Sequence, residues 1–500
     1  MTVTDPGPAA VQAPGRTAEL ASRLARTLGA DRVLTDPAQL RTYECDGLAS
    51  FRVQPGVVVL AGSRSDVVET VRLCAELGVP FVARGSGTGL SGGAMPVAEG
   101  VLIVLSRLRA ILSVDPDNAR IVVEPGVINL WVTREATPHA QAYAPDPSSQ
   151  QVCSIGGNLA ENAGGAHCLK YGFTVNHVMG AEVVLPDGDV VHLGGTAPEH
   201  PGYDLLGAFV GSEGTLGVAT KITLRVVQVP ESVQTMLVGF RTVEDAAGAV
   251  SDIIAAGILP AAIEMMDALA IEAAEAAVKC GYPAGAVAVL VIELDGPQAE
   301  VDAQFAQVEG LVAARSAFET RIAQDAGERA LMWKGRKSAF AAVGRISPAY
   351  MVQDGVIPRT QIGEVLGEIG RLADEAGMRV ANVFHAGDGN LHPLILFDDA
   401  VPGSSHQAEE LGFAILQLCI DKGGSITGEH GVGVEKKSKM SEQFTDGDLD
   451  TMQLVRCAFD PDGLANPGKL FPTPRLCGER PGPRTAADDA VRTATYGEVF

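Results

Sequence analysis

Three clusters of glycine and small polar residues constrain this chain more than any other feature. They are RGSGTGLSGG at 84–93, SIGGNLAENAGG at 154–165 and GSEGTLG at 211–217. Glycine accounts for 58 of the 500 residues, yet no G-X-Y period and no low-complexity segment explains it. Glycine at this density supplies tight turns and lets backbone approach a ligand closely. We therefore expect a fold built around a large bound molecule.

The first cluster contains the spacing G-x-G-x-x-G at Gly87, Gly89 and Gly92. A Rossmann fingerprint requires a helix that opens at its last glycine. Here Pro96 follows, and then the β-type run VLIVL at 101–105, so we reject a Rossmann fold. A glycine-rich turn after a strand offers free N–H groups, which is typical of a nest that binds pyrophosphate. The alternative is an ordinary glycine-rich surface loop.

The other two clusters strengthen the prediction of a cofactor. The second follows PDPSS at 145–149 and has almost only small side chains, so its backbone can lie flat against a planar ligand. The third precedes a predicted strand. Each alone has a plain alternative, a helix–sheet crossing for the second and a turn for the third. Together they predict a phosphate-bearing cofactor.

Hydrophobic patterning predicts two kinds of organisation along the chain. The first part has a lead-in helix at 17–30, a helix that begins at Ser65 and stops at Gly78, and a hairpin that turns at Pro186-Asp187-Gly188. From about residue 232, strands alternate with alanine-rich helices. This alternation predicts a second α+β unit with a sheet covered by helices.

Charge, hydropathy and cysteine usage exclude several classes of protein. The formal net charge of −23 disfavours nucleic acid and anionic membrane surfaces as partners. No apolar run approaches the ~20 residues that span a bilayer. The N-terminal MTVTDPGPAAVQAPG lacks the regions of a signal peptide. Eight scattered cysteines without a C-x-x-C pair predict reduced thiols in a cytoplasmic protein.

Metal-ligand residue types occur in two glycine-flanked loops. His385 and His392 bound the segment HAGDGNLH between the predicted strands RVANVF and PLILF, so a tight hairpin would place them close together. Glu429 and His430 lie in GSITGEHGVG at 424–433. Two imidazoles and a carboxylate can hold a divalent transition metal and leave positions open for substrate. The alternative is a hairpin with two solvent-facing histidines.

With these motifs and the closing NPGKLF at 466–471, the chain resembles the FAD fold of vanillyl-alcohol oxidase and p-cresol methylhydroxylase over about residues 40–474. Within that class it is similar to FAD-linked 2-hydroxy-acid oxidases and dehydrogenases, the glycolate oxidase flavoprotein subunit and D-lactate dehydrogenase type. The resemblance implies an α+β protein with a two-subdomain FAD-binding domain and an α+β cap domain with an antiparallel sheet. The expected boundaries are a tail and lead-in helix at 1–50, the FAD-binding domain at 51–230, the substrate or cap domain at 231–435, a C-terminal segment returning to the flavin at 436–475, and a tail at 476–500.

The resemblance also implies which residues bind FAD. The first cluster would hold the pyrophosphate, and the second and third would line the flavin. The expected FAD-binding residues are Arg84, Gly85, Ser86, Gly87, Thr88, Gly89, Leu90, Ser91, Pro145, Ser148, Ser154, Gly156, Gly157, Asn158, Ala160, Asn162, Gly164, Gly165, Tyr171, Glu213, Gly214, Val218 and Asn466. Some family members attach FAD through a histidine in the first cluster. Ser86 and Thr88 stand there instead, so we expect non-covalent FAD.

By the same resemblance, His385, His392 and Glu429 are expected to hold Zn, Mn or Fe. An α-hydroxy acid can chelate such an ion, which lowers the pKa of the hydroxyl. His430 is the expected base, and the C2 hydrogen then leaves as hydride to flavin N5, giving a 2-oxo acid. Arg336, in WKGRKSAF, resembles the family's carboxylate-binding arginine; the alternative is a solvated helix face.

Substrate and partners are less constrained. By the same resemblance, members that act on hydroxy-diacids tend to carry a polar group about two residues after the second metal-binding histidine. Leu394 is apolar there, which favours a small monoacid, glycolate or D-lactate, over a D-2-hydroxyglutarate-type diacid. A metal-dependent hydrolase and a catalytically inert cofactor-binding subunit are further alternatives. The chain has no iron–sulfur cysteine run, so transfer of electrons to a cluster or quinone would need a partner protein. Such a partner could hold a cytoplasmic protein at the membrane periphery.

Overall fold

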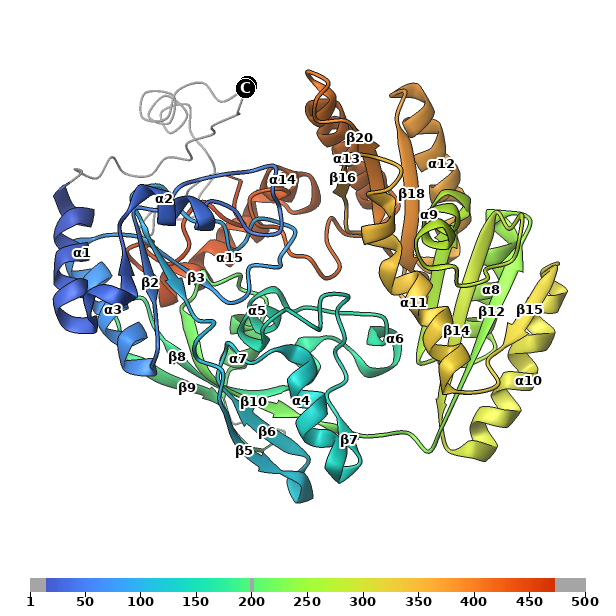
Figure 1. The fold of residues 1–500 in the computed structure, drawn as a ribbon, viewed down its shortest axis with the longest axis horizontal. Coiled ribbons are helices and arrows are strands. Elements are labelled where there is room, and N and C mark those ends of the chain that lie inside the picture. Colours follow the sequence, from blue (N-terminus) through green and yellow to red (C-terminus); the bar gives the residue numbers. More distant parts are fainter. Residues whose placement is uncertain (1–14, 198–201, 473–500) are drawn as a thin grey trace.

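The computed structural model describes residues 15–197 and 202–472. Figure 1 shows two units side by side. The described residues of 15–228 and 435–472 build the first, which we call the two-sheet unit, and residues 232–421 build the second, which we call the nine-stranded unit. The predicted tail at 476–500 and the start of the N-terminal tail lie outside the described residues.

The first sheet of the two-sheet unit carries the strand that ends in the first glycine cluster. Its strands are, in order, β1 (Val33–Leu34), β2 (Val57–Leu60), β4 (Val101–Val104) and β3 (Phe81–Arg84), and β2, β4 and β3 run parallel. Its helices are α1 (Gly15–Leu28), α2 (Pro37–Leu40) and α3 (Arg64–Leu77). Gly78 ends α3 at a φ of +62°, as predicted, but the helix begins one residue before the predicted Ser65, because the Ser63 side chain caps it.

The second sheet is antiparallel. Its strands are, in order, β5 (Ile111–Asp115), β6 (Arg120–Val123), β10 (Val218–Arg225), β8 (Val178–Val184) and β9 (Val190–Gly194). The predicted hairpin is confirmed, since β8 and β9 flank Pro186-Asp187-Gly188. The remaining elements are α4 (Asn129–Ala136), β7 (Gln141–Ala142), α5 (Ile155–Glu161), α6 (Cys168–Tyr171), α7 (Leu205–Phe209) and β11 (Val227–Gln228). Residues 85–100 contain no helix, which confirms that the first cluster is not a Rossmann fingerprint.

The nine-stranded unit is an antiparallel sheet with helices on both faces, as predicted. The strand path is β15 (Glu319–Ile322), β12 (Ser232–Phe240), β14 (Ala288–Gly296), β13 (Ala262–Asp267), β18 (Arg379–His385), β19 (Asn390–Leu391) and β17 (Gly355–Val356). Beside it, β20 (Pro393–Phe397) pairs with β18 and with β16 (Ala349–Val352). One face packs against α8 (Val243–Ala255), α10 (Gln298–Ala314), α12 (Ile362–Glu375) and α13 (Ser404–Asp421). The other packs against α9 (Ala268–Val278) and α11 (Ala326–Val343).

The end of the chain returns to the two-sheet unit through α14 (Met440–Gln443) and α15 (Asp446–Phe459). Ala465 then pairs with Phe81, at the start of β3, so Asn466 arrives beside the first glycine cluster. In the described residues no helix is long and apolar enough to cross a membrane.

The cysteines only partly follow the prediction of reduced thiols. Cys45, Cys74, Cys153, Cys168, Cys280 and Cys419 are free. Cys457 is disulfide-bonded, which corrects the prediction at that position. The spacing of cysteines along the chain could not reveal it, because a disulfide depends on which residues the fold brings together.

Candidate active site

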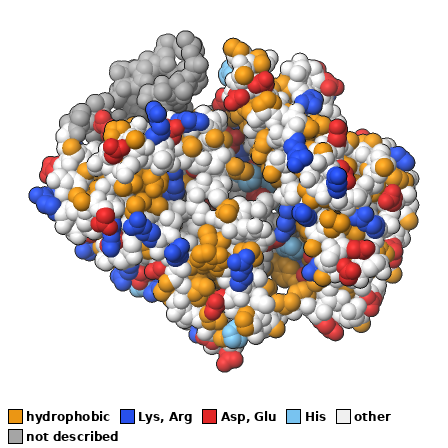
Figure 2. Space-filling view, viewed as in Figure 1, with side chains coloured by type: hydrophobic (Ala, Val, Ile, Leu, Met, Phe, Trp, Pro, Cys, Tyr) orange, Lys and Arg blue, Asp and Glu red, His pale blue; other side chains and the backbone are white. Residues whose placement is uncertain are grey.

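A cavity of about 460 Å³ lies where the two units meet, within the usual size range of cofactor sites. Its walls come from all three glycine clusters, from α11 and β16 of the nine-stranded unit, and from the loop that carries Glu429 and His430. Figure 2 shows histidine side chains in the hollow between the units. The cavity therefore joins the glycine clusters to Glu429 and His430, whereas His385 and His392 lie outside its lining.

The first cluster forms a nest of free N–H groups. Among the described residues, none accepts a hydrogen bond from the backbone N–H groups of residues 87–91. The loop turns at Gly87, whose φ of +68° favours glycine. Ser86 N donates to Ser154 Oγ over 3.3 Å, which ties the first cluster to the second. A side chain at Gly85 would overlap that same Oγ. The loop thus leaves several donors free for a phosphate group.

Most of the predicted FAD-binding residues line this cavity. They are Gly85, Ser86, Gly87, Thr88, Gly89, Leu90, Ser148, Ser154, Gly156, Gly157, Asn158, Ala160, Glu213, Gly214 and Val218. A Cβ at Gly89 would meet its nearest neighbour only at 3.9 Å, so backbone there borders open space that a ligand can fill. The free donors and this open, small-residue wall fit FAD.

The other predicted FAD-binding residues lie outside the cavity wall: Arg84, Ser91, Pro145, Asn162, Gly164, Gly165, Tyr171 and Asn466. Arg84 is buried and donates to the carbonyls of Ala94 and Tyr43, which shapes the first cluster. Asn466 Nδ2 donates to the carbonyls of Gly93 (2.8 Å) and Glu213 (2.6 Å) and so joins the first and third clusters. Such residues support the cavity wall rather than form it.

Tyr171 links the two units. Its hydroxyl donates to Asp295 Oδ2 over 2.6 Å, and Lys170 also pairs with Asp295. Close by, His167 lies 2.9 Å from Asp146 Oδ2 and 3.2 Å from Glu293 Oε1. The contacts to Glu293 and Asp295 fasten α6 to β14. Sequence alone gave no signal of these contacts, because their partners are more than 120 residues apart.

The predicted metal ligands come together. The ligand atoms of His385, His392 and Glu429 all lie within 4.8 Å of one another. Glu429 Oε1 is 3.2 Å from His385 Nε2 and 2.9 Å from His392 Nε2. Both histidines are buried, so the alternative of solvent-facing histidines is wrong. His392 is 1 % exposed, and neither ring nitrogen has a partner with hydrogen-bond geometry in the described residues. An orphaned buried imidazole of this kind fits a metal ligand.

Glu264, which the sequence analysis missed, supports His385. Its Oε1 lies 2.7 Å from His385 Nδ1, on the ring side away from Glu429. Metal-binding histidines usually donate their second N–H to such a carboxylate. Burial alone would raise the pKa of Glu264, but Arg336 and His385 lower it. The one available signal was an acidic residue in the middle of the apolar run AAIEMM.

Arg336 lies behind the cavity. It is on α11, as predicted, but it is 2 % exposed, so the alternative of a solvated face is wrong. Its Nη2 lies 2.7 Å from Glu264 Oε2, yet its Nε and Nη2 lack partners with hydrogen-bond geometry in the described part of the chain. Unsatisfied buried donors fit a carboxylate ligand. The cavity wall itself is formed by the neighbouring Lys337 and by Phe340.

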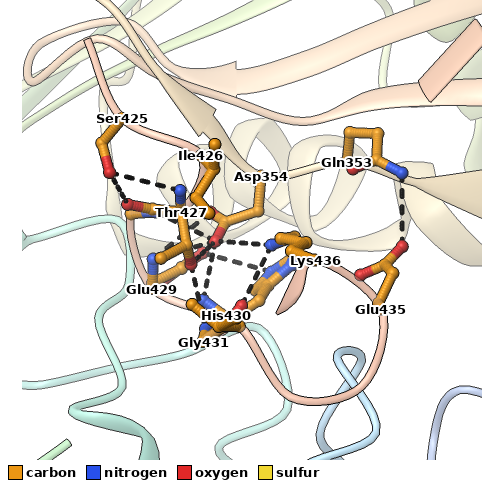
Figure 3. Close-up of polar contacts among 12 residues, drawn as sticks. Gln353, Asp354, Ser425, Ile426, Thr427, Glu429, His430, Gly431, Glu435 and Lys436 are labelled. Carbon is orange, nitrogen blue, oxygen red and sulfur yellow. Dashed lines mark hydrogen bonds and ion pairs between the residues drawn. The ribbon is translucent and has the colours of Figure 1, made fainter. Parts of the chain in front are cut away.

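Asp354 holds the loop that carries Glu429 and His430, as Figure 3 shows. It is fully buried, and it accepts hydrogen bonds from Thr427 Oγ1 (2.5 Å) and from the backbone N–H groups of residues 428–430 (2.9–3.3 Å). Lys436 Nζ adds a contact at 3.4 Å. Asp354 also lies within reach of His392 and His430, a second grouping of metal-ligand types. Because its oxygens are already occupied by donors, the His385, His392 and Glu429 grouping is the better metal site.

His430 stacks on His392, with ring centroids 4.8 Å apart and an interplanar angle of 6°. It lines the cavity. Burial lowers the pKa of His430 to about 4, so the ring is neutral near pH 7 and can accept a proton.

Leu394 does not face the cavity. It is fully buried in the core between the sheet, α9 and α11, so it cannot select the substrate. The argument for a monoacid from Leu394 is therefore wrong. The aromatic side chains that line the cavity are Phe209, Phe340 and Tyr350.

Comparison with known proteins gives the family. Residues 55–194 match the FAD binding domain model, and residues 229–470 match the C-terminal domain of FAD linked oxidases. The chain is 50% identical to the glycolate oxidase subunit GlcD of Escherichia coli (strain K12) over 89% of this chain and 90% of that protein. It is 32% identical to a D-lactate dehydrogenase of Anaerostipes hadrus over 88% of this chain and 94% of that one.

Solved structures share the fold at low identity. A 4-ethylphenol oxidase from Gulosibacter chungangensis aligns with a TM-score of 0.78 and 20% identity over 94% of this chain and 99% of that one. A p-cresol methylhydroxylase aligns with a TM-score of 0.78 and 17% identity, over 93% and 98%. The predicted fold class is confirmed. The chain thus belongs to the FAD-linked oxidase family that includes GlcD and D-lactate dehydrogenases, and it is an FAD-dependent oxidoreductase.

Proposed function

We propose that this protein oxidises a small 2-hydroxy acid, glycolate or D-lactate, to the corresponding 2-oxo acid. The observation that carries the proposal is a single cavity lined at one end by the free N–H groups of the first glycine cluster and at the other by Glu429 and His430. One proposed metal ligand, Glu429, and the expected base, His430, therefore share one space with the glycine-rich nest. Relatives that are named for glycolate and D-lactate support the substrate class.

In this proposal the residues have the following binding roles. The nest of residues 87–91 would hold FAD without a covalent bond, and His385, His392 and Glu429 would hold Zn, Mn or Fe. When bound, the ion lowers the pKa of the substrate hydroxyl, and the flavin accepts hydride at N5. The supporting observations are the unpaired donors of the first cluster and the orphaned nitrogens of His392.

His430 and Arg336 act on the substrate in this proposal. The neutral ring of His430 accepts the hydroxyl proton, and its stacking on His392 keeps it beside the metal cluster. Arg336 binds the carboxylate through its guanidinium, whose Nε has no partner in the described residues and whose Nη2 is paired with Glu264. Loss of the hydroxyl proton and of a hydride from C2 leaves a carbonyl, so the product is a 2-oxo acid.

A D-2-hydroxyglutarate-type dehydrogenase is the second candidate. A diacid needs a second cation, and Lys337 offers one on the cavity wall, 3.6 Å from Asp146 Oδ2. Phe340 and Tyr350 instead give that wall an aromatic surface, which suits a short monoacid. A metal-dependent hydrolase would not use FAD, so that alternative does not explain why the chain belongs to an FAD-binding family.

The test is anaerobic bleaching of the bound flavin by glycolate, D-lactate, L-lactate and D-2-hydroxyglutarate. We expect rapid bleaching by glycolate or D-lactate. Faster bleaching by D-2-hydroxyglutarate than by the monoacids, and loss of that preference in Lys337→Ala, would select the second candidate. No bleaching by any hydroxy acid, with FAD and metal both bound, would overturn the proposal.

A further inference from the structure

Two carboxylates that the proposed mechanism does not use face each other in the cavity wall. Glu161 ends α5, and Glu213 lies in the third glycine cluster. A Cβ at Gly93 would overlap Glu161 Oε1 and lie 3.3 Å from Glu213 Oε2. A Cβ at Gly431 would overlap Glu161 Oε2 and lie 2.8 Å from Glu213 Oε1. The two side chains therefore both approach Gly93, in the first glycine cluster, and Gly431, the residue after His430.

The surroundings of the two carboxylates differ. Glu213 is 4 % exposed and accepts hydrogen bonds from the backbone N–H groups of Val432 (2.7 Å) and Gly433 (2.8 Å). Such donors stabilise a carboxylate anion. Glu161 Oε2 is buried and has no hydrogen-bond partner in the part of the chain that the structure describes. Burial raises the pKa of Glu213, but these two N–H donors oppose that shift, whereas no described hydrogen bond opposes it at Glu161. Glu161 is therefore the better candidate of the two for the neutral acid.

No described cation forms an ion pair with Glu161, because the nearby charged groups are engaged elsewhere. Lys436 Nζ donates to Gly431 O (3.2 Å) and lies 3.4 Å from Asp354. Lys469 Nζ donates to the Met95 carbonyl (2.9 Å) and to Asn466 Oδ1 (3.1 Å).

Asp46, the remaining charged neighbour, accepts hydrogen bonds from the backbone of Leu48 and Ala94. Burial and the charge of Glu213 together raise the pKa of Glu161 well above its usual value. Two buried carboxylates in this arrangement cannot both ionise.

We propose that Glu161 keeps its proton in the folded enzyme and donates a hydrogen bond through its hydroxyl to a nitrogen or oxygen of the flavin ring. Ser212 is further evidence that a polar edge of the ligand lies against this wall. It precedes Glu213, is 7 % exposed, lines the same cavity, and its hydroxyl has no partner among the described residues. Because reduced flavin is richer in electrons than oxidised flavin, a donor at this place stabilises the reduced form. The proposal rests on FAD occupying the cavity, and it does not depend on which acid is oxidised.

The test measures the midpoint potential of the FAD-loaded protein by spectroelectrochemistry, without any hydroxy acid. Glu161→Leu removes the donor, whereas Glu161→Gln keeps an N–H donor that cannot ionise. In Glu161→Leu we expect the preference of the site for reduced over oxidised flavin to fall at least tenfold relative to the parent. That loss lowers the two-electron midpoint potential by about 30 mV. Glu161→Gln should stay near the parent at neutral pH. The matched control is Glu135→Gln on α4, which is exposed and should leave the potential unchanged.

Two results would overturn the proposal. One is an unchanged potential in Glu161→Leu with FAD fully bound. The other comes from infrared spectroscopy, which needs no flavin reduction and remains usable if Glu161→Leu fails to fold. The parent should show the carbonyl stretch of a protonated carboxyl group at neutral pH, and Glu161→Gln should lack it. Identical spectra would show that Glu161 is ionised. Because neither measurement uses substrate, a failure of the proposed hydroxy-acid activity would leave both results readable.

Discussion

Replacing Glu264 by glutamine should weaken the metal site and the fold together. One oxygen of this carboxylate lies 2.7 Å from His385 Nδ1, and the other lies 2.7 Å from Arg336 Nη2. Glu264 is 1 % exposed, so water cannot replace either contact. The amide can still accept a hydrogen bond from His385, but it carries no charge. His385 becomes a poorer ligand, and Arg336 loses its counterion.

The expected magnitudes follow from these two losses. Loss of a carboxylate behind a metal-binding histidine typically costs ~10–100-fold in metal affinity. Leaving a buried charge without its partner costs about 3–5 kcal/mol of folding free energy. A domain typically has a free energy of unfolding of roughly 5–15 kcal/mol, so this loss is a large part of the total. The variant should therefore still fold, but with a lower unfolding midpoint.

Metal titration of the metal-free protein and urea unfolding measure the two effects separately. Glu264→Gln combined with Arg336→Met removes both charges, so it should recover much of the stability without recovering metal affinity. Glu272→Gln, an exposed position on α9, is the control. Unchanged metal affinity and an unchanged unfolding midpoint in Glu264→Gln would refute the reasoning.

Four further outcomes are expected. FAD should be released intact by acid or heat, because no histidine lies in the first glycine cluster; flavin that stays on the denatured chain would contradict this. His430→Ala should retain FAD and metal yet reduce the flavin ~10²–10⁴-fold more slowly in stopped flow, and a parental rate at neutral pH would exclude His430 as the base. Arg336→Lys should raise KM for the acid about five- to a hundredfold, because the planar fork is lost; an unchanged KM would count against carboxylate binding. Burial lowers the pKa of His167, but Asp146 and Glu293 outweigh it and raise that pKa to about 10, above the unfolded value of about 6.5. The stabilisation is therefore complete below about pH 6.5 and is lost as the pH rises toward 10, so urea unfolding should show a decline over that range in the parent and a flatter profile in His167→Gln.

Local patterns predicted the parts of the site that depend on neighbouring residues. The turn residues between His385 and His392 predicted a hairpin, and β18 does pair with β19 and β20. Pro96 and the β-type run that follows the first cluster predicted a turn rather than a Rossmann helix, and residues 85–100 contain no helix. In each case the determining interactions lie within about ten residues, so the sequence displays them directly.

Supporting residues were missed because their roles depend on distant partners. Glu264 contacts His385 only because β13 pairs with β18, and the two residues are 121 positions apart in the sequence. Asp354 lies in VQDGV, which by itself indicates only a turn, yet it orients the loop of Glu429 and His430 from 75 residues away. Neither hydrophobic periodicity nor a short sequence motif indicates such long-range contacts. Glu264 alone left a trace, as an acid within an apolar strand.

The error at Leu394 shows where substrate selection must be sought. The resemblance to family members that act on diacids suggested a selecting side chain near this position, two residues after His392. His392 lies at the break between β19 and β20, so the regular alternation of side chains along a strand does not relate it to Leu394, which points into the core. Phe340 lies one helical turn beyond Arg336, with the guanidinium 6.0 Å from its ring, and it lines the cavity. Of the side chains of Leu394 and Phe340, only Phe340, four residues after Arg336 on α11, lies where it can contact a molecule in the cavity.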